Sequence, residues 1–203
     1  MNYFEFFSLP RKLTLDVVAL EKQFYTLSRK LHPDRFAGKP VAEQEAALAQ
    51  SSLLNDAYRT LKDPILRTQY LLKLEGVELE EQSKAATEAA RASGTEKKQV
   101  VPPELLEEVF ELNMQLQEMR MANQMGEEEP ELRRDLMTAK DAFDAKMVET
   151  QAELESLWGV WDAGVDAGND ATQTRARDAM VELLNRRSYL RNLVRDVNEA
   201  LGL

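Results

Sequence analysis

The sequence predicts an all-α fold in three parts: an N-terminal helical domain (1–75), a linker (76–102) and a C-terminal three-helix bundle (103–203). Three observations support this prediction. Apolar residues recur at helical spacings of three and four along most of the chain. No segment alternates apolar and polar residues as a half-buried strand does. The stretch from Glu80 to Val100 contains almost no large apolar residue and therefore has little with which to join a core.

The first long helix is expected from Asp16 to Leu31, with Thr14 as a plausible N-cap. One apolar stripe runs along it at spacings of 3, 4, 3 and 4, through Val17, Leu20, Phe24, Leu27 and Leu31. Pro33 has no amide hydrogen and disfavours helical geometry at His32, so the helix is expected to end near Leu31. This helix can pack against a neighbour through a single face.

A second long helix is expected from about Val41 to Leu61, with Leu54, Ala57 and Leu61 facing inward. Asp63 and Pro64 are typical of an N-cap and first helical turn, and Gly76 is typical of a helix end. A short third helix therefore completes the N-terminal domain, which is a helical hairpin with short helices beside it.

Three apolar stripes predict the C-terminal bundle. The first contains Leu105, Val109, Leu112, Leu116 and Met119; the second contains Leu132, Leu136, Phe143, Met147, Leu154, Trp158 and Trp161; the third contains Met180, Leu183, Leu190, Val194, Val197 and Leu201. Gly164 and Gly168 are expected to break the second helix, and Asp170 to cap the third. Both tryptophans are expected in the core. Short connections favour antiparallel neighbours.

The composition excludes several classes of function. The chain has no cysteine and one histidine, so it offers neither a thiolate nor an imidazole cluster for a metal, and we expect no metal or cofactor. A net charge of −10 argues against nucleic-acid binding. No apolar run is long enough to span a membrane, and the start resembles no signal or transit peptide. We expect a cytoplasmic protein.

The one histidine lies in the stretch "RKLHPDRF", residues 29–36. A catalytic role for His32 and Asp34 has little support, because no serine or cysteine lies nearby to be activated. The alternative is a purely structural role, in which these residues form a turn and Pro33 ends the helix. However, a basic strip made of Lys22, Arg29, Lys30 and Arg35 leads to this turn. Residues 1–75 carry net charge +2, against −12 for the rest, so the strip is unusual in this acidic chain.

A basic-faced helix ending in His32-Pro33-Asp34, followed by a helix containing "NDAYRTLKDP", resembles the J-domain of Hsp70 co-chaperones over about residues 1–75. The segments "YFEFFSLP" and "DPILRTQYLLKLEG" are similar to the HscB type, the J-proteins of iron-sulfur cluster assembly. The resemblance implies a co-chaperone with no active site of its own. It would stimulate ATP hydrolysis by a dedicated, HscA-like Hsp70 bound through His32, Pro33, Asp34, Lys22, Arg29, Lys30 and Arg35.

The first helix of the bundle carries a second apolar stripe beside its core stripe, formed by Leu106, Phe110 and Met114. Either the helix is buried over an unusually wide face, or one stripe is exposed for a partner. On the last helix, Tyr189 and Leu193 also lie one residue off the core positions, where a partly buried packing residue is the common alternative. Spacing alone leaves both questions open.

The HscB resemblance implies that this face binds an IscU-like scaffold protein, on which the iron-sulfur cluster is built. Matching "LLEEVFELNMQLQEM" and "RRSYLRNL" to the family assigns the contact to Leu106, Phe110, Glu111, Met114, Glu118 and Tyr189. Glu107 and Met114 depart from the family pattern, which has a hydrophobic residue at the first position and an acidic one at the second. The absence of cysteine fits a protein that handles the scaffold without competing for the cluster.

Three functional hypotheses follow from the sequence. In the first, the protein delivers the scaffold to an Hsp70 and promotes cluster transfer. In the second, it is a J-domain co-chaperone that recruits Hsp70 to a different client or complex. In the third, it is a helical adaptor with a decayed J-domain. The wide apolar face could also support weak self-association.

Overall fold

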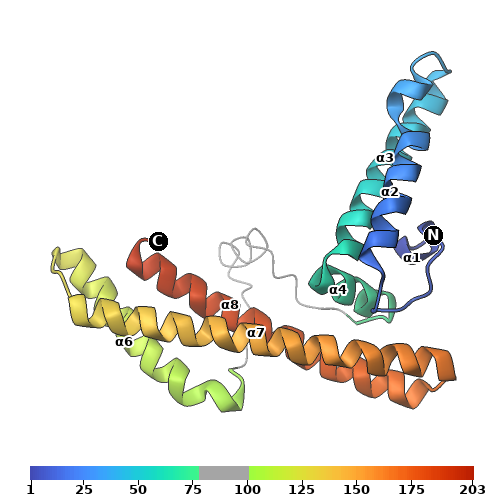
Figure 1. Ribbon diagram of the computed structural model, residues 1–203. Helices are drawn as coiled ribbons and strands as arrows, with labels where there is room; N and C mark the ends of the chain where they lie inside the picture. The colour runs from blue at the N-terminus through green and yellow to red at the C-terminus, as the bar shows by residue number, and fades with distance from the viewer. Residues whose placement is uncertain (78–100) are drawn as a thin grey trace. The chain divides into compact units, whose positions relative to one another are not determined.

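The computed structural model describes residues 1–77 and 101–203, and all regular structure in these ranges is helical (Figure 1). The all-α prediction is therefore confirmed. Most of the predicted linker, including Glu80–Val100, lies outside the described residues. The chain divides into two compact units. Unit 1 holds residues 1–77 and 157–178, and unit 2 holds residues 101–156 and 179–203.

The N-terminal helices of unit 1 are α1 (Tyr3–Phe6), α2 (Val17–Leu31), η1 (Pro33–Phe36), α3 (Val41–Lys62) and α4 (Pro64–Leu74). Helices α2 and α3 lie side by side as a hairpin, with η1 in the connection at its far end from α4 (Figure 1). Helix α3 also contacts α1, η1 and α4. The predicted hairpin with short helices is confirmed, and it presents the histidine-containing turn at one end.

Local capping explains where these helices begin. The N-cap of α2 is Asp16, not Thr14, because the Asp16 carboxylate accepts the amides of Val18 and Ala19, both at 3.0 Å. A carboxylate at this position also interacts favourably with the positive end of the helix dipole. Asp63 caps α4 as predicted, accepting the Leu66 amide at 2.8 Å.

The core of this part of unit 1 is aromatic and aliphatic. Its fully buried side chains come from α1, the following loop and the three longer helices: Phe4, Phe7, Leu13, Leu20, Leu54, Leu61, Leu71 and Leu72. Phe24 of α2 stacks on Tyr58 of α3 with ring centroids 4.1 Å apart. The Tyr58 hydroxyl donates to Glu21 at 3.0 Å, which ties the two helices together at the same level.

The C-terminal half contains η2 (Pro103–Leu105), α6 (Leu106–Met125), α7 (Pro130–Ala167) and α8 (Asp170–Leu201). In unit 2 these helices share one apolar core, which confirms the predicted bundle. Its buried side chains are Leu105, Val109, Leu112, Leu116, Met119, Leu136, Phe143, Leu190, Leu193, Val197, Ala200 and Leu201. All five residues of the predicted core stripe of the first bundle helix are therefore buried.

Two predictions about the connection between α7 and α8 are wrong. Gly164 does not break α7, which continues to Ala167. A Cβ at Gly164 would lie 2.9 Å from the Gln173 side chain, so this glycine serves close packing of the two helices. Asn169 rather than Asp170 caps α8, since the Asn169 side-chain oxygen accepts the Thr172 amide at 3.0 Å. Gly168, with φ of 59°, makes the turn.

Candidate partner-binding surfaces

The turn after α2 holds an exposed carboxylate in a defined position. His32 Nδ1 accepts the backbone amide of Asp34 at 3.3 Å and lies 3.5 Å from the Asp34 carboxylate. As the acceptor of this amide, Nδ1 faces the Asp34 backbone, and the contact orients the imidazole against the turn. Pro33 opens η1 and fixes the backbone between them. The Asp34 side chain is 88% exposed and can accept donors from a partner.

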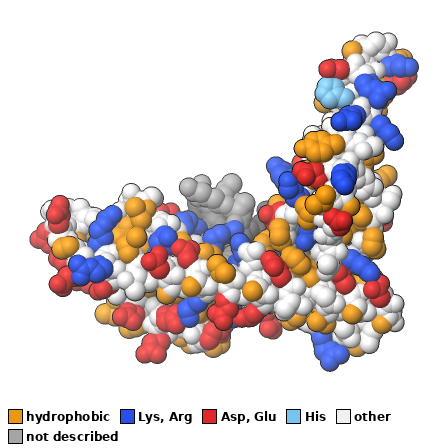
Figure 2. All heavy atoms as spheres, in the orientation of Figure 1, with side chains coloured by type: hydrophobic (Ala, Val, Ile, Leu, Met, Phe, Trp, Pro, Cys, Tyr) orange, Lys and Arg blue, Asp and Glu red, His pale blue; other side chains and the backbone are white. Residues whose placement is uncertain are grey.

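The predicted basic strip is exposed along the same hairpin. Arg35 Nη1 donates to the Arg29 carbonyl at 3.2 Å, which holds the Arg35 side chain against the end of α2. Figure 2 colours the single histidine pale blue and shows lysine and arginine side chains near it on this arm. Within the described part of the chain, Lys22, Arg29, Lys30 and Arg35 form no ion pair. Their charges are therefore available to a partner.

Helix α6 carries an exposed apolar stripe beside its core stripe. Leu106, Phe110 and Met114 are 55%, 69% and 59% exposed, although the neighbouring core residues of the same helix are buried. The question left open by the sequence is thus answered in favour of an exposed stripe. Large apolar side chains clustered on a surface are typical of a protein-binding site. We call these three residues the α6 stripe.

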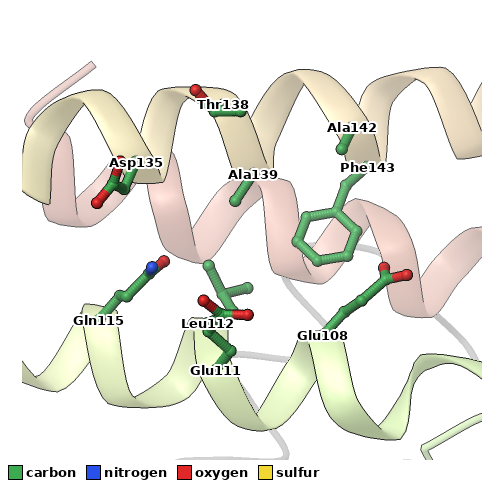
Figure 3. Close-up of a pocket in the computed structure, with 9 residues that line it drawn as sticks. All are labelled: Glu108, Glu111, Leu112, Gln115, Asp135, Thr138, Ala139, Ala142 and Phe143. Carbon is green, nitrogen blue, oxygen red and sulfur yellow. The ribbon is translucent and has the colours of Figure 1, made fainter.

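The two glutamates predicted beside the α6 stripe lie in different surroundings. Glu111 lines a groove of about 420 Å³ between α6 and α7. Figure 3 shows Leu112 and Phe143 facing each other at its base, with Asp135 on α7 across from α6. Glu118 lines a second groove near the end of α6. Both glutamates are exposed.

Tyr189 and Leu193 of α8 are packing residues in this structure. Leu193 is buried in the core of unit 2, and Tyr189 is half-buried against that core. Burial raises the pKa of the Tyr189 phenol, and the nearby Asp196 carboxylate adds to the shift. Tyr189 therefore presents only part of its ring to a partner, unlike the α6 stripe.

The segment "WGVWDAGVDAGND", whose role the sequence did not reveal, packs against the N-terminal helices within unit 1. We call residues 157–178 the α7–α8 tip. The buried Asp162 carboxylate accepts the amides of Leu13 at 2.8 Å and Thr14 at 2.9 Å. Trp161 is buried and donates its Nε1 hydrogen to the Arg11 carbonyl at 3.2 Å. These contacts hold the loop that leads into α2.

Trp158 is half-buried rather than part of the bundle core, so that expectation is wrong. Its indole donates to the Thr68 hydroxyl at 3.1 Å, and the Arg67 guanidinium lies 5.0 Å from the ring centroid. Arg67 itself is buried and donates to the Leu61 carbonyl at 2.6 Å. Trp158 thus joins α4 instead of the bundle core. The position of Trp158 in an apolar stripe indicated that the side chain is buried, but it did not indicate which helix the side chain contacts.

The described residues contain no group of three or more His, Cys, Asp or Glu side chains placed to hold a metal ion. No helix among them is both long and apolar enough to cross a bilayer. The described surface also carries a charged turn after α2 and an exposed apolar stripe on α6.

Comparisons with known proteins agree with this arrangement. The family model described as "DnaJ domain" matches residues 2–70. The structure of the chaperone HscB from Vibrio cholerae matches with a TM-score of 0.57 and 27% identity, covering 99% of both chains. The human co-chaperone protein HscB matches with a TM-score of 0.61, covering 100% of this chain and 84% of that one. At 23% identity, the human match is a likeness of fold.

The DnaJ-domain match covers the hairpin that presents His32, Pro33 and Asp34, and the likeness to the Vibrio cholerae chaperone extends over the bundle that presents the α6 stripe. Sequence pattern, fold and comparisons therefore agree on both parts. The chain therefore carries a J-domain at its N-terminus, and over its whole length it is similar to the chaperone HscB from Vibrio cholerae.

Proposed function

We propose that this protein stimulates the ATPase of a dedicated HscA-like Hsp70 through the turn after α2, and brings an IscU-like scaffold to that Hsp70 through the α6 stripe. The cluster on the scaffold is cargo, and its transfer is the outcome. The observation that carries the proposal is the exposed Asp34 carboxylate, set in a proline-fixed turn at the end of a basic strip.

The chemistry of the turn suits binding to an arginine on an otherwise acidic surface. A carboxylate can accept two parallel hydrogen bonds from one guanidinium, and such pairs are stronger and more directional than neutral ones. Because the turn is fixed before binding, little entropy is lost there on association. The cations Lys22, Arg29, Lys30 and Arg35 attract an acidic partner surface and set the orientation of approach.

The chemistry of the α6 stripe suits a partner with an apolar centre and a basic rim. Leu106 and Phe110 offer the exposed apolar area, and Phe110 is the side chain best suited to fill a pocket. Glu111 and Glu118 supply acidic neighbours that would pair with cations at the edge of the contact. Tyr189, being half-buried, would contribute only its exposed edge.

The first experiment measures the steady-state ATPase rate of the organism's HscA-like Hsp70 with this protein, the scaffold, both or neither. We expect the two together to stimulate more than either alone. Asp34→Asn should abolish stimulation, because losing the charged pair costs about 2–5 kcal/mol of binding. Asp56→Asn, an exposed aspartate on α3 of the same hairpin, is the matched control and should stimulate normally. Normal stimulation by Asp34→Asn would contradict the proposed Hsp70 contact.

The second experiment measures scaffold binding by calorimetry. Leu106→Ser with Phe110→Ser should reduce affinity at least tenfold, about 1.4 kcal/mol, while Val148→Ser, an exposed apolar residue on α7, should not. Equal affinity of the double variant and the wild type would contradict the assignment of the α6 stripe. If ATPase stimulation is normal but the intact protein does not bind the scaffold, the protein instead recruits Hsp70 to a different client.

A further inference from the structure

A second apolar surface lies beyond the α6 stripe, near the C-terminal end of α6. It is a groove of about 410 Å³ whose walls include the side chains of Met114, Met121 and Met125. Met121 and Met125 are 51% and 67% exposed, and they lie seven and eleven residues after Met114, or about two and three helical turns along the same side. We call this feature the methionine groove. Neither Met121 nor Met125 belongs to the predicted scaffold contact.

The groove has a fixed end, formed by the turn that closes α6. Gly126 has a φ of 72°, a left-handed conformation that favours glycine. Its amide donates to the Asn123 carbonyl at 3.4 Å, and the next amide, of Glu127, donates to the Ala122 carbonyl at 3.0 Å. This pairing is the usual way to satisfy the last carbonyls of a helix. It brings Glu127 back beside the last turn of α6, where it lines the groove.

Packing of the bundle does not explain the two methionines. The core contacts of this part of α6 are made by Leu116 and Met119, which are both buried. Met121 and Met125 instead expose unbranched, polarisable side chains that can adapt to an irregular partner surface. Exposed apolar side chains grouped in this way are typical of a binding surface.

The charge of the groove defines what can occupy it. Glu118, Glu127 and Glu129 line it, and none of the described residues that line it is a lysine or an arginine. None of these carboxylates forms an ion pair within the described residues of the chain. An anionic lipid surface or a nucleic acid would be repelled, whereas a segment carrying both apolar and cationic side chains would be complementary.

We propose that the methionine groove is a second contact for the scaffold protein, and that it takes a lysine- or arginine-containing apolar segment of that protein. The inference rests on the proposed function, because Met114 and Glu118 belong both to the predicted scaffold contact and to this groove. The contact surface on α6 thus runs on past Glu118 to the turn at Gly126. Met114 belongs to both the α6 stripe and the groove, so the two apolar surfaces are continuous.

The methionines themselves provide the first test. The chain has eight, so labelling their ε-methyl groups with carbon-13 gives a small spectrum that can be assigned with Met→Leu variants. On addition of unlabelled scaffold protein, the signals of Met114, Met121 and Met125 should shift or broaden. Met119 and Met180 are buried and Met137 is exposed on α7, so their signals should change least. Unchanged Met121 and Met125 signals, with Met114 shifted, would overturn the inference and leave the proposed function standing.

Affinity measurements provide the second test. Met121→Ser with Met125→Ser should weaken scaffold binding about tenfold, because the complex would lose two apolar side chains that it buries in part. Met121→Leu with Met125→Leu keeps the apolar volume and should bind within about threefold of wild type. Glu127→Gln with Glu129→Gln should weaken binding at low salt and much less at high salt, since exposed charges are screened. All the substituted side chains are exposed, so each variant should fold.

The outcomes separate the two proposals. Wild-type affinity in the serine pair, with weakened binding in Leu106→Ser with Phe110→Ser, overturns only the groove. No scaffold binding by the intact protein overturns both. A second copy of this chain is the rival occupant. If sedimentation shows self-association that the serine pair abolishes while scaffold affinity is unchanged, the groove belongs to the dimer and the inference is wrong.

Discussion

Helices α7 and α8 contribute residues to both compact units. They contact the rest of each unit in a different way. In unit 2 their side chains join α6 in an apolar core. In unit 1 the α7–α8 tip meets the N-terminal helices through the buried Trp161 ring and also through buried hydrogen bonds, made by the Asp162 carboxylate and the Trp161 indole. An apolar core tolerates many arrangements of similar volume, whereas a buried carboxylate with two amide donors permits one.

The tip is therefore built for a defined geometry rather than for strength alone. Asp162 fixes the backbone at Leu13 and Thr14, and Lys12 pairs with Asp166 at 2.6 Å on the surface beside them. The same loop leads into α2, whose other end presents Asp34. The following changes should therefore act differently in the two units.

The largest expected effect is on the apolar core of unit 2. Phe143→Ala should lower the free energy of unfolding by about 4 kcal/mol, because it removes a buried ring and leaves a cavity. Hydrogen exchange followed by mass spectrometry should show lost protection mainly in residues 101–156 and 179–203. Val148→Ala, an exposed position on the same helix, should change stability by less than about 0.5 kcal/mol. Equal loss of protection in residues 1–77 would contradict separate cores.

A smaller and more local effect is expected at the α7–α8 tip. Asp162→Asn replaces one acceptor oxygen with a donor facing a backbone amide, which should cost about 2–3 kcal/mol. Hydrogen exchange should speed up at Leu13 and Thr14 and leave the unit 2 core unchanged. Asp166→Asn is the matched control, because its exposed ion pair with Lys12 is worth about 1 kcal/mol or less. Identical exchange in the two variants would show that the Asp162 contacts do not fix the loop.

The same contrast explains what could be predicted from sequence. The apolar core of the bundle depends on periodicity along single helices, so the spacing of Leu105, Val109 and Leu112 was enough to identify it. The turn at His32 was also predictable, since Pro33 acts on its immediate neighbours. The α6 stripe was found as one of two alternatives, and only the folded chain shows that Leu106 is exposed.

The polar contacts of the tip could not be predicted in this way. Leu13 and Asp162 are 149 residues apart, and no periodicity specifies which carboxylate meets which amide. Trp158 illustrates the same limit, because its stripe indicated burial but not its contact with Thr68. A signal was available for the methionine groove: Met121 and Met125 continue the side of the helix already marked by Met114. We expect residues that extend a predicted stripe along one helix to be easier to find from sequence than contacts between residues far apart in the chain.

The smallest expected effect concerns two tyrosines, one in each unit. Burial raises the pKa of Tyr70 in unit 1 and of Tyr189 in unit 2, so the fold favours the neutral phenol in both. Their contribution to stability is fully present below the unfolded pKa of about 10 and is lost as pH rises through the folded pKa. The two tyrosines differ in their hydrogen bonding, because the Tyr70 hydroxyl oxygen accepts the Tyr3 amide at 2.9 Å.

Tyr70→Phe separates these contributions. At pH 7 it should cost about 1 kcal/mol through the lost hydrogen bond. Above pH 10 the wild type loses the stability that came from keeping Tyr70 neutral, while the variant has no phenol to ionise there. Urea unfolding followed by circular dichroism from pH 8 to 11.5 should therefore show the two stability curves converging. Tyr25→Phe, at an exposed position, should run parallel to wild type. Parallel curves for Tyr70→Phe as well would mean that burial of this ring does not favour the neutral phenol.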